Sequence, residues 1–307
     1  MTHVGLVGVG FIGKLFLERC LDAGHEVTVY DVDTDQVAAA EGAGAAVADS
    51  PADLAARTDA VVMAVPGSPE VEATLEGGGV GRGVAHTGSD APNAGGDGLL
   101  DGLSDGQLVV DATTTRPETS VVAEELCDEA GAAFVEAPIT GGAPPEGYHM
   151  MVGGTGERYE AASDLLDVLC EGHARVGPVP DATVLKLGLQ MRYAGHHAVD
   201  AEVVEFVRDN GVDPAYFTDF LVFDMFDGYF SGDFSQDIEG LGGLAIWHKD
   251  VGYAREYARE NGTALPLAAV VHEAYKATVR RSGEGDGHAS ALVKYWLALN
   301  DAEDRYE

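Results

Sequence analysis

Hydrophobic and polar positions follow one pattern over the first 70 residues of the chain. Short apolar runs rich in β-branched residues alternate there with stretches in which apolar residues recur at helical spacing. This alternation is typical of βαβ units that feed a parallel sheet. The expected strands are residues 4–7, 26–30, 45–48 and 60–65, followed by 108–111 and 133–136. The expected helices between the first of these strands are residues 11–23, 37–41 and 53–56.

From about Thr183 the pattern changes to long helices, and almost no strand signal remains. Asp181 before this stretch and Gly211 after it predict a single helix of about 28 residues. Further helices are expected at residues 214–226, 246–261, 267–281 and 289–299. The predicted architecture is a Rossmann-type, doubly wound α/β domain at residues 1–175 and an all-α domain at 176–307, with the long helix between them.

Residues 77–107 differ in composition from their surroundings, with 11 glycines among 31 residues. Such a segment is expected to form an irregular excursion on the surface. It is either a lid or an oligomer contact, or a solvated insertion without a role, because long loops cost little in closure entropy.

The formal net charge of −34 arises from 52 acidic and 18 basic side chains along 307 residues. Only five lysines occur, and without a basic patch neither nucleic acid nor an anionic membrane is an expected partner. In dilute buffer the many acidic side chains repel one another. In molar salt the Debye length falls to about 3 Å, so this repulsion is largely screened. We therefore expect a halophile's protein, and an ordinary acidic protein of low-salt surroundings is the alternative.

Three cysteines, Cys20, Cys127 and Cys170, lie far apart in the sequence and lack metal-type spacing. This usage favours buried thiols in a reducing compartment. The chain opens without a basic segment followed by an apolar stretch, and no apolar run approaches eighteen residues. A cytoplasmic location is therefore expected.

A GxGxxG motif follows the first expected strand and opens the first helix. Its glycines are Gly8, Gly10 and Gly13, and Phe11 and Ile12 lie between the last two. The first glycine permits a tight turn, the second lets the backbone approach a pyrophosphate, and the third lets helix and strand pack closely. The alternative is that these glycines serve strand–helix packing only.

Asp31 ends the second expected strand, eighteen residues beyond Gly13. A carboxylate at this place accepts both ribose hydroxyls of a dinucleotide. Its charge would repel a 2′-phosphate, and residues 32–34 contain no arginine to bind one. NAD is therefore expected in preference to NADP, unless Asp31 only forms a turn.

Seven segments spread along the chain carry a further signal. They are GLVGVGFIG at 5–13, VVDATTTRP at 109–117, EAPITGG at 136–142, MVGG at 151–154, Lys186 after VGPVPDATVL, HKD at 248–250 and GEGDGHASAL at 283–292. In this order they resemble the β-hydroxyacid dehydrogenase family, which includes 3-hydroxyisobutyrate dehydrogenase and, more distantly, 6-phosphogluconate dehydrogenase. The resemblance implies an NAD-dependent enzyme that pairs through its helical half as a homodimer or homotetramer.

The resemblance implies a catalytic role for Lys186, as general acid in carbonyl reduction and as base in alcohol oxidation. A lysine suits this work when partial burial lowers its pKa. From the residues alone, a lysine whose charged end reaches solvent is the alternative.

On the substrate side, the resemblance implies that Thr113 contacts the substrate and that a turn formed by Thr140, Gly141 and Gly142 holds its carboxylate. Glycine suits this turn because only a residue without Cβ lets successive amides approach an anion. The alternative is a glycine-rich segment that simply turns. Gln190 stands where the family usually has a substrate-binding asparagine, so we expect an altered pocket.

On the cofactor side, the resemblance implies contacts from Val65 and Pro66, which follow a strand, and from Thr114. It also implies that Lys249 reaches the cofactor and that Asp250 orients it. A plain ion pair between Lys249 and Asp250 on the surface of a helix is the alternative.

Helical spacing extends the predicted site along one face of the long helix. This face is expected to carry Lys186, Gln190, Tyr193 and His197. Tyr193 is expected to shape the substrate pocket. No metal is expected at His196 and His197, because consecutive histidines of a helix point in different directions; packing, a solvated role and a substrate contact stay open.

The sequence thus predicts an oxidoreductase that interconverts a small 3-hydroxy acid and its semialdehyde or keto acid with NAD. One alternative is a short 6-phosphogluconate dehydrogenase, to which the segment GYHMMVGG is similar, although Leu189, Gln190 and Tyr193 differ from that subgroup. Another is a catalytically silent NAD-binding module, against which the presence of Lys186 argues.

Overall fold

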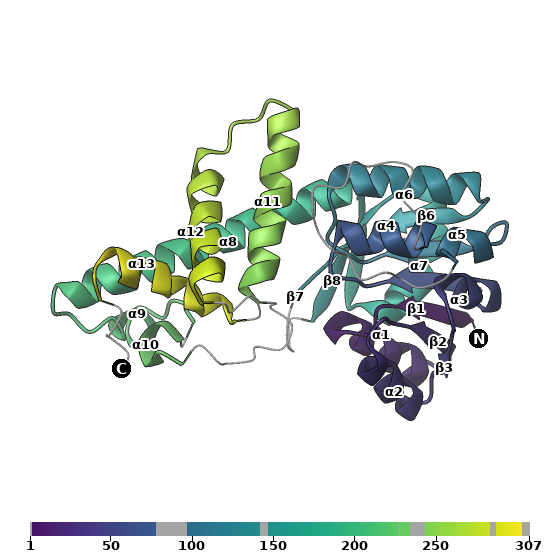
Figure 1. Ribbon diagram of the computed structural model, residues 1–307, viewed down its shortest axis with the longest axis horizontal. Helices are drawn as coiled ribbons and strands as arrows, with labels where there is room; N and C mark the ends of the chain where they lie inside the picture. Colours follow the sequence, from purple (N-terminus) through teal and green to yellow (C-terminus); the bar gives the residue numbers. More distant parts are fainter. Residues whose placement is uncertain are drawn as a thin grey trace. The chain divides into compact units, whose positions relative to one another are not determined.

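The computed structural model describes residues 2–77, 97–141, 147–226, 228–233, 243–282 and 287–302. The chain forms two compact units, Met1–Lys186 and Leu187–Glu307 (Figure 1). The division between residues 175 and 176 that the sequence suggests for the two functional domains stays a prediction.

The first unit is built on a sheet with the strand order β3-β2-β1-β4-β5-β6-β8-β7, in which β9 pairs with β8. The strands are β1 (His3–Val7), β2 (Glu26–Tyr30), β3 (Ala46–Val47), β4 (Ala60–Met63), β5 (Leu108–Asp111), β6 (Ala133–Glu136), β7 (Ile139–Gly141), β8 (Tyr148–Gly153) and β9 (Gly172–Gly177). Strands β1 to β6 pair in parallel, β8 is antiparallel to β6 and β7, and β9 is parallel to β8. The parallel part has the order of a Rossmann-type sheet, which confirms the predicted fold class.

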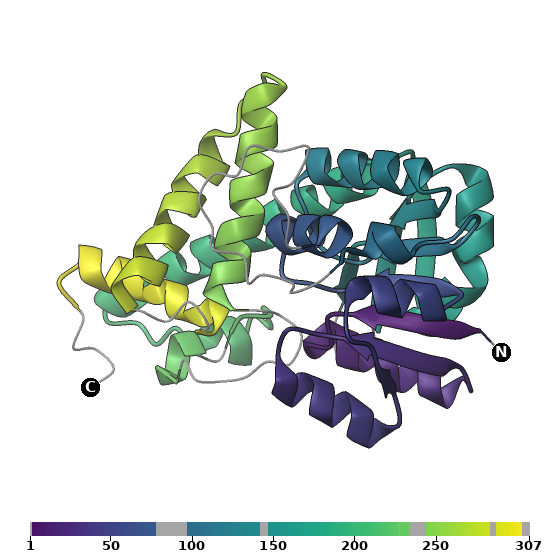
Figure 2. The same cartoon turned by 45° about the vertical axis from the view of Figure 1, so that its right-hand side comes forward.

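Helices cover both faces of this sheet (Figure 2). They are α1 (Phe11–Asp22), α2 (Thr34–Ala43), α3 (Pro51–Arg57), α4 (Ser68–Glu76), α5 (Leu99–Gly102), α6 (Pro117–Glu129) and α7 (Gly156–Leu169). Successive strand residues point to opposite faces: Val62 joins the core under α1 and α7, whereas Val61 joins the core under α3, α4 and α6. Burial on both faces explains why these strands are continuous apolar runs in the sequence.

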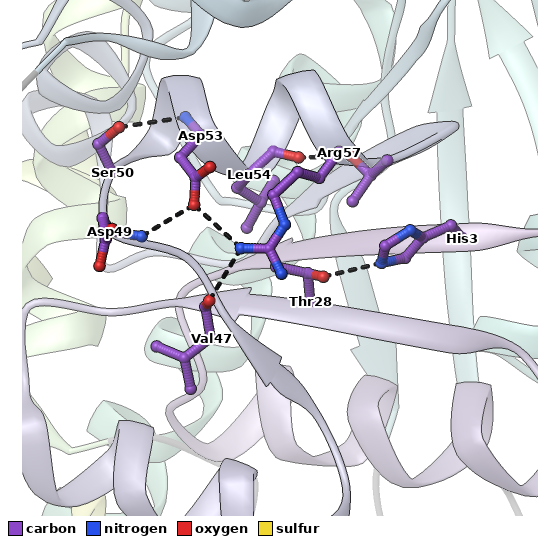
Figure 3. Close-up of polar contacts among 9 residues, drawn as sticks. His3, Thr28, Val47, Asp49, Ser50, Asp53, Leu54 and Arg57 are labelled. Carbon is purple, nitrogen blue, oxygen red and sulfur yellow. Dashed lines mark hydrogen bonds and ion pairs between the residues drawn. The ribbon is translucent and has the colours of Figure 1, made fainter.

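Helix α3 is joined to the edge strand β3 by polar contacts (Figure 3). The hydroxyl of Ser50 accepts the N–H of Asp53 at 3.1 Å and so caps the helix. Arg57 donates to the Asp53 carboxylate and to the carbonyl of Val47, each at 3.0 Å. The N–H of Asp49 and the Arg57 guanidinium lower the pKa of Asp53. These contacts lie at the edge of the sheet, where β3 pairs with β2, and they fix the position of α3 relative to β3.

The glycine-rich segment 77–107 is only partly described, because residues 78–96 lie outside the described part of the chain. Residues 97–107 depart from the expected irregular surface excursion at α5, which contains the completely buried Leu99, whereas residues 97, 101 and 104–106 are exposed. Gln107 is buried as well. Leu99 therefore belongs to the core of the first unit, although the stretch around it is partly exposed.

Gly98, which precedes α5, and Gly102, which ends it, explain the difference. A Cβ at Gly98 would lie 2.3 Å from the carbonyl oxygen of Leu75, and a Cβ at Gly102 would lie 2.1 Å from that of Ala52. Glycine is required here for close backbone approach, and composition alone does not separate this use from a loose loop.

The second unit is helical, and α8 begins in the first unit and continues into it. Its elements are α8 (Asp181–Asp209), α9 (Tyr216–Asp219), α10 (Gly228–Ser231), α11 (Leu244–Glu260), α12 (Pro266–Ser282), the 3₁₀-helix η1 (Ala289–Leu292) and α13 (Val293–Leu299). Gly211 follows α8 with a φ of +75°, as expected of the residue that ends the long helix. None of the helices in the described residues is long and apolar enough to cross a membrane.

The helix expected at residues 214–226 is wrong over most of its length. Only Tyr216–Asp219 is helical, and Val222 has a φ of +60°, which an α-helix does not allow. The apolar side chains that suggested a helix face, among them Phe220 and Phe223, are exposed. Without burial of that face, nothing holds the segment in a helix.

Candidate active site

The glycine turn between β1 and α1 has the geometry that its sequence predicts. Gly8 has a φ of +86°, and a Cβ there would lie 2.4 Å from the carbonyl oxygen of Ala64. A Cβ at Gly13 would lie 2.0 Å from the carbonyl oxygen of Gly8. A Cβ at Gly10 would meet no atom within 4 Å. Two glycines are thus required by the fold itself, whereas Gly10 keeps the helix start accessible.

The start of α1 suits an anion. Gly10 precedes the helix, and the first turn contains no acidic residue. Phe11 is exposed, while Ile12 packs against the core and holds the turn in place. Free backbone N–H groups and the helix dipole favour negative charge at such an end, so a dinucleotide pyrophosphate fits here.

Asp31 follows β2 and is bonded to the same turn. Its Oδ2 accepts the N–H of Val9 at 2.7 Å, and its Oδ1 accepts the N–H of Asp33 at 2.9 Å. Each carboxylate oxygen keeps a further lone pair for a ribose hydroxyl. Asp33 caps α2 by accepting from Asp35 and Gln36, so a second carboxylate occupies the helix end nearest this site.

The carboxyl ends of β4 and β5 bring further predicted residues together. The N–H of Val65 donates to the hydroxyl oxygen of Thr113 at 3.2 Å. The N–H of Thr113 donates to Asp111 at 3.0 Å, and both of these residues are buried. Pro66 is exposed and Thr114 is half-buried. Ligands of open parallel sheets bind at this edge, and the contacts of these residues with cofactor and substrate stay predictions.

Thr140 and Gly141 end strand β7, which pairs with β8. Gly141 has a φ of +115°, and a Cβ there would lie 2.2 Å from the carbonyl oxygen of Gly147. This position therefore requires glycine. Gly142, the third residue of the predicted carboxylate-binding turn, lies outside the described residues.

Lys186 lies in the second turn of α8 and is only 6% exposed. A lysine with its charged end in solvent, the alternative left open by the residues alone, is therefore wrong. Val184 and Leu185, which precede it, are exposed. The lysine thus belongs to the buried face of the helix.

Glu136 ends β6, and sequence reasoning assigns it no role in the site. It is 1% exposed, and its Oε1 accepts the N–H of Ala182 at 2.9 Å, at the start of the helix that carries Lys186. Burial raises the pKa of this carboxyl, and hydrogen bonds from Thr183, Ser120 and Ala182 oppose the rise. The sequence offered only its place in EAPITGG as a signal.

In the second unit, Gln190 and Lys249 converge on Asp250. The amide nitrogen of Gln190 donates to Asp250 Oδ2 at 2.6 Å, and Lys249 Nζ lies 3.1 Å from Oδ1. Asp250 is completely buried, so an ion pair on the surface of a helix does not describe this contact. The Lys249 ammonium also lies 5.2 Å from the ring centre of Tyr253, at cation–π distance.

Tyr193 and His197 continue along α8 and contact aromatic residues. Tyr193 packs edge-on against Trp247 with 6.1 Å between ring centres. His197 stacks on Phe226 at 4.4 Å, and burial lowers its pKa to about 4. This environment gives His197 a packing role. Among the described residues, no group of three or more His, Cys, Asp or Glu side chains is placed to hold a metal ion.

All three cysteines are free and buried, as expected.

The first unit combines a doubly wound sheet, a glycine turn at a helix start, an acidic residue after β2 and a buried lysine in α8. Together these features define an oxidoreductase that uses a dinucleotide.

Comparison with protein families agrees with this class. Residues 3–177 match the family described as the NAD-binding domain of 6-phosphogluconate dehydrogenase. Residues 181–296 match the family described as NAD-binding of NADP-dependent 3-hydroxyisobutyrate dehydrogenase. The chain belongs to this family of β-hydroxyacid dehydrogenases, and it is a dehydrogenase that acts on a hydroxyl group.

Individual relatives are distant. The mitochondrial 3-hydroxyisobutyrate dehydrogenase of Rattus norvegicus is 26% identical over 290 residues, covering 90% of this chain and 81% of that protein. The NAD(+)-dependent, decarboxylating 6-phosphogluconate dehydrogenase of Haloferax volcanii is 29% identical over 232 residues, covering 68% and 70%. The crystal structure of 3-hydroxyisobutyrate dehydrogenase from Salmonella typhimurium shares the fold, with a TM-score of 0.78 and 22% identity over 96% of this chain and 99% of that one.

Proposed function

We propose that the protein interconverts a small 3-hydroxy acid and its semialdehyde or keto acid, with NAD as the cofactor, as a 3-hydroxyisobutyrate dehydrogenase-like enzyme. The observation that carries this proposal is the burial of Lys186 in the helix that follows the nucleotide-binding sheet. Oxidation of an alcohol requires a base that accepts the hydroxyl proton, and reduction of the carbonyl requires an acid that returns it; one buried amine can serve as both.

NAD, held by the glycine turn and Asp31, would supply the hydride acceptor for the substrate carbon. Lys186 takes the hydroxyl proton in this direction and returns it to the carbonyl oxygen in the other. The Thr113 oxygen accepts the Val65 N–H, so its hydroxyl hydrogen can be donated to the substrate carboxylate. Thr140, Gly141 and Gly142 complete the hold on that carboxylate. Such positioning supplies much of the rate.

Gln190 and Tyr193 are proposed to set the choice of substrate. Asp250 only accepts hydrogen bonds when ionised, so it turns the Gln190 amide nitrogen toward itself. The amide oxygen of Gln190 is then presented as an acceptor for a substrate hydroxyl. Lys249, held by Asp250, would contact the cofactor.

The acidic residues after β2 support a preference for NAD. Asp31 would bind the ribose hydroxyls, and Asp33 already occupies the start of α2, so a 2′-phosphate would meet two carboxylates. Gly8, Gly10 and Gly13 with Phe11 and Ile12 would hold the pyrophosphate, and Val65, Pro66 and Thr114 would pack on the nicotinamide half.

A decarboxylating 6-phosphogluconate dehydrogenase is the second candidate, favoured by the 29% identity to the Haloferax volcanii enzyme. Gln190 and Tyr193 argue against it, because they replace an asparagine and an acidic residue of that subgroup. A catalytically silent NAD-binding module is a third reading, against which buried Lys186 argues.

The net charge of −34 supports a cytoplasmic protein of a halophile. The family resemblance supports a homodimer or homotetramer, with substrate binding and pairing assigned to residues 176–307.

The proposal is tested by NAD reduction in molar KCl with 3-hydroxyisobutyrate, glycerate, serine, threonate, 3-hydroxypropionate and 6-phosphogluconate. Turnover with one of the 3-hydroxy acids is expected. Turnover with 6-phosphogluconate alone would favour the second candidate, and NADH formation with none of the six would contradict the proposal.

A further inference from the structure

Glu136 joins the sheet to the start of α8 through three hydrogen bonds. Its Oε1 accepts the backbone N–H of Ala182 at 2.9 Å and that of Thr183 at 3.3 Å. Its Oε2 accepts the Thr183 hydroxyl at 2.6 Å. A carboxylate at a helix start accepts hydrogen bonds from N–H groups that have no partner within the helix. A negative charge there also interacts favourably with the positive end of the helix dipole.

The fold makes room for this carboxylate. Glu136 pairs with Gly153 across strands β6 and β8. A Cβ at Gly153 would lie 2.2 Å from Glu136 Oε1, so no other residue fits there without displacing the side chain. Gly153, the first of the two glycines of the MVGG segment, therefore has a structural explanation in the placement of Glu136.

A chain of buried hydroxyls extends from Glu136 to the loop after β5. The Ser120 hydroxyl lies 3.1 Å from that of Thr183 and 2.9 Å from that of Thr115. All three residues are at most 1% exposed. Thr183 donates its one hydroxyl hydrogen to Glu136, so Ser120 donates to Thr183 and Thr115 donates to Ser120.

This loop also carries Thr113, which lies two residues before Thr115. At the other end of the chain, Lys186 lies three and four residues after Thr183 and Ala182, on the same face of α8. All three of these helix residues are buried. Fixing the first turn of α8 therefore fixes the position from which Lys186 extends.

We propose that Glu136 is a positioning residue, which holds the first turn of α8 in register with the loop after β5 and thereby places Lys186 relative to Thr113. This inference rests on the proposed function, in which Lys186 exchanges the proton. Glu136 itself touches neither substrate nor cofactor in this account.

The sharpest test compares Thr183→Val with Thr183→Ser, because the first removes the hydroxyl with little change of shape and the second retains it. Glu136→Gln keeps one acceptor oxygen for the helix N–H groups but replaces the other by an amide nitrogen, which cannot accept the Thr183 hydroxyl. Thr58→Val is the matched control: Thr58 is a buried threonine of the same unit, whose hydroxyl donates to the carbonyl of Leu54 at 2.9 Å.

Two readouts separate positioning from stability. The first is kcat against the Kd for NAD. The second is the titration of the Lys186 ¹³Cε signal, which is resolved by lysine labelling because the chain has only five lysines and is assigned by its loss in Lys186→Ala. A variant that only loosens the fold lowers the unfolding midpoint and moves neither readout.

We expect Thr183→Val and Glu136→Gln to lower kcat by about ten- to a hundredfold, with the Kd for NAD retained and the Lys186 titration shifted. Thr183→Ser should keep kcat and the Lys186 titration close to those of the wild type, and Thr58→Val should change only stability. If Lys186→Ala abolishes turnover while Thr183→Val and Glu136→Gln leave kcat and the Lys186 titration as in the wild type, the inference is wrong and the proposed function stands. If Lys186→Ala retains turnover, both are overturned.

Discussion

The backbone N–H of Val9 donates a 2.7 Å hydrogen bond to Oδ2 of Asp31. The acidic residue after β2 is therefore held at the glycine turn between β1 and α1, where the ribose and pyrophosphate of a dinucleotide would meet. The same residue supports the structure of the turn and, in our proposal, the choice of cofactor.

Replacement of Asp31 by asparagine tests that choice. The substitution keeps the shape and removes the charge that repels a 2′-phosphate. We expect the ratio of kcat/KM for NAD over NADP to fall by about tenfold, the value of one charge-assisted hydrogen bond. Asp35→Asn, at an exposed acidic residue of α2, is the matched control. A wild-type preference for NADP would reject the assignment.

The parallel part of the sheet was predictable because its strands are buried on both faces and so appear as short apolar runs. Strands β7 to β9 were not predicted: β9 (Gly172–Gly177) exposes Ala174, Arg175 and Val176, so the sequence carries no apolar run there. Helices α4, α6 and α7 were also not among the expected elements.

Within the site, the glycines and Asp31 were found from their spacing along the chain. Glu136 and Thr183 bond across 47 positions, and neither residue type signals the contact. Such a pairing depends on which strand end meets which helix start, and that is set by the folded topology alone.

The contact between Gln190 and Asp250 predicts a loss of stability. In Asp250→Asn, one acceptor oxygen becomes an amide nitrogen, so either Gln190 or Lys249 would lose its acceptor in a buried position. We expect the free energy of unfolding to fall by about 1–3 kcal/mol, together with a higher KM for NAD as Lys249 loses its partner. Guanidinium chloride titration measures the first effect. Glu273→Gln removes the partner of Lys276 in a surface ion pair and should give no measurable change; equal effects of the two substitutions would argue against a special role for Asp250.

The pKa of His197 predicts an acid-sensitive stability. Burial is the main cause that lowers this pKa from 6.5 to about 4. The unfolded chain therefore takes up a proton at higher pH than the folded one, and stability is lost as pH falls from 6.5 toward 4, by about 3 kcal/mol at most. His197→Gln should flatten this part of the stability curve, while His149→Gln, at an exposed residue, serves as control. Parallel curves for wild type and His197→Gln would contradict the prediction.

The charge of −34 predicts that salt stabilises the protein. Screening reduces the repulsion among acidic side chains, so Tm should rise steadily between about 0.1 M and molar KCl, over which the Debye length falls from about 10 Å to about 3 Å. Differential scanning calorimetry measures this. Maximal stability at the lowest salt would indicate an ordinary acidic protein instead.

The central claim is that the buried amine of Lys186 exchanges the substrate proton, and Lys186→Ala tests it most directly. We expect kcat with the preferred hydroxyacid to fall by about 10²–10⁴-fold, the usual contribution of a general acid or base, with the Kd for NAD unchanged. Lys276→Ala, at a lysine that is 43% exposed, should behave as the wild type. Turnover of Lys186→Ala close to that of the wild type would contradict the account.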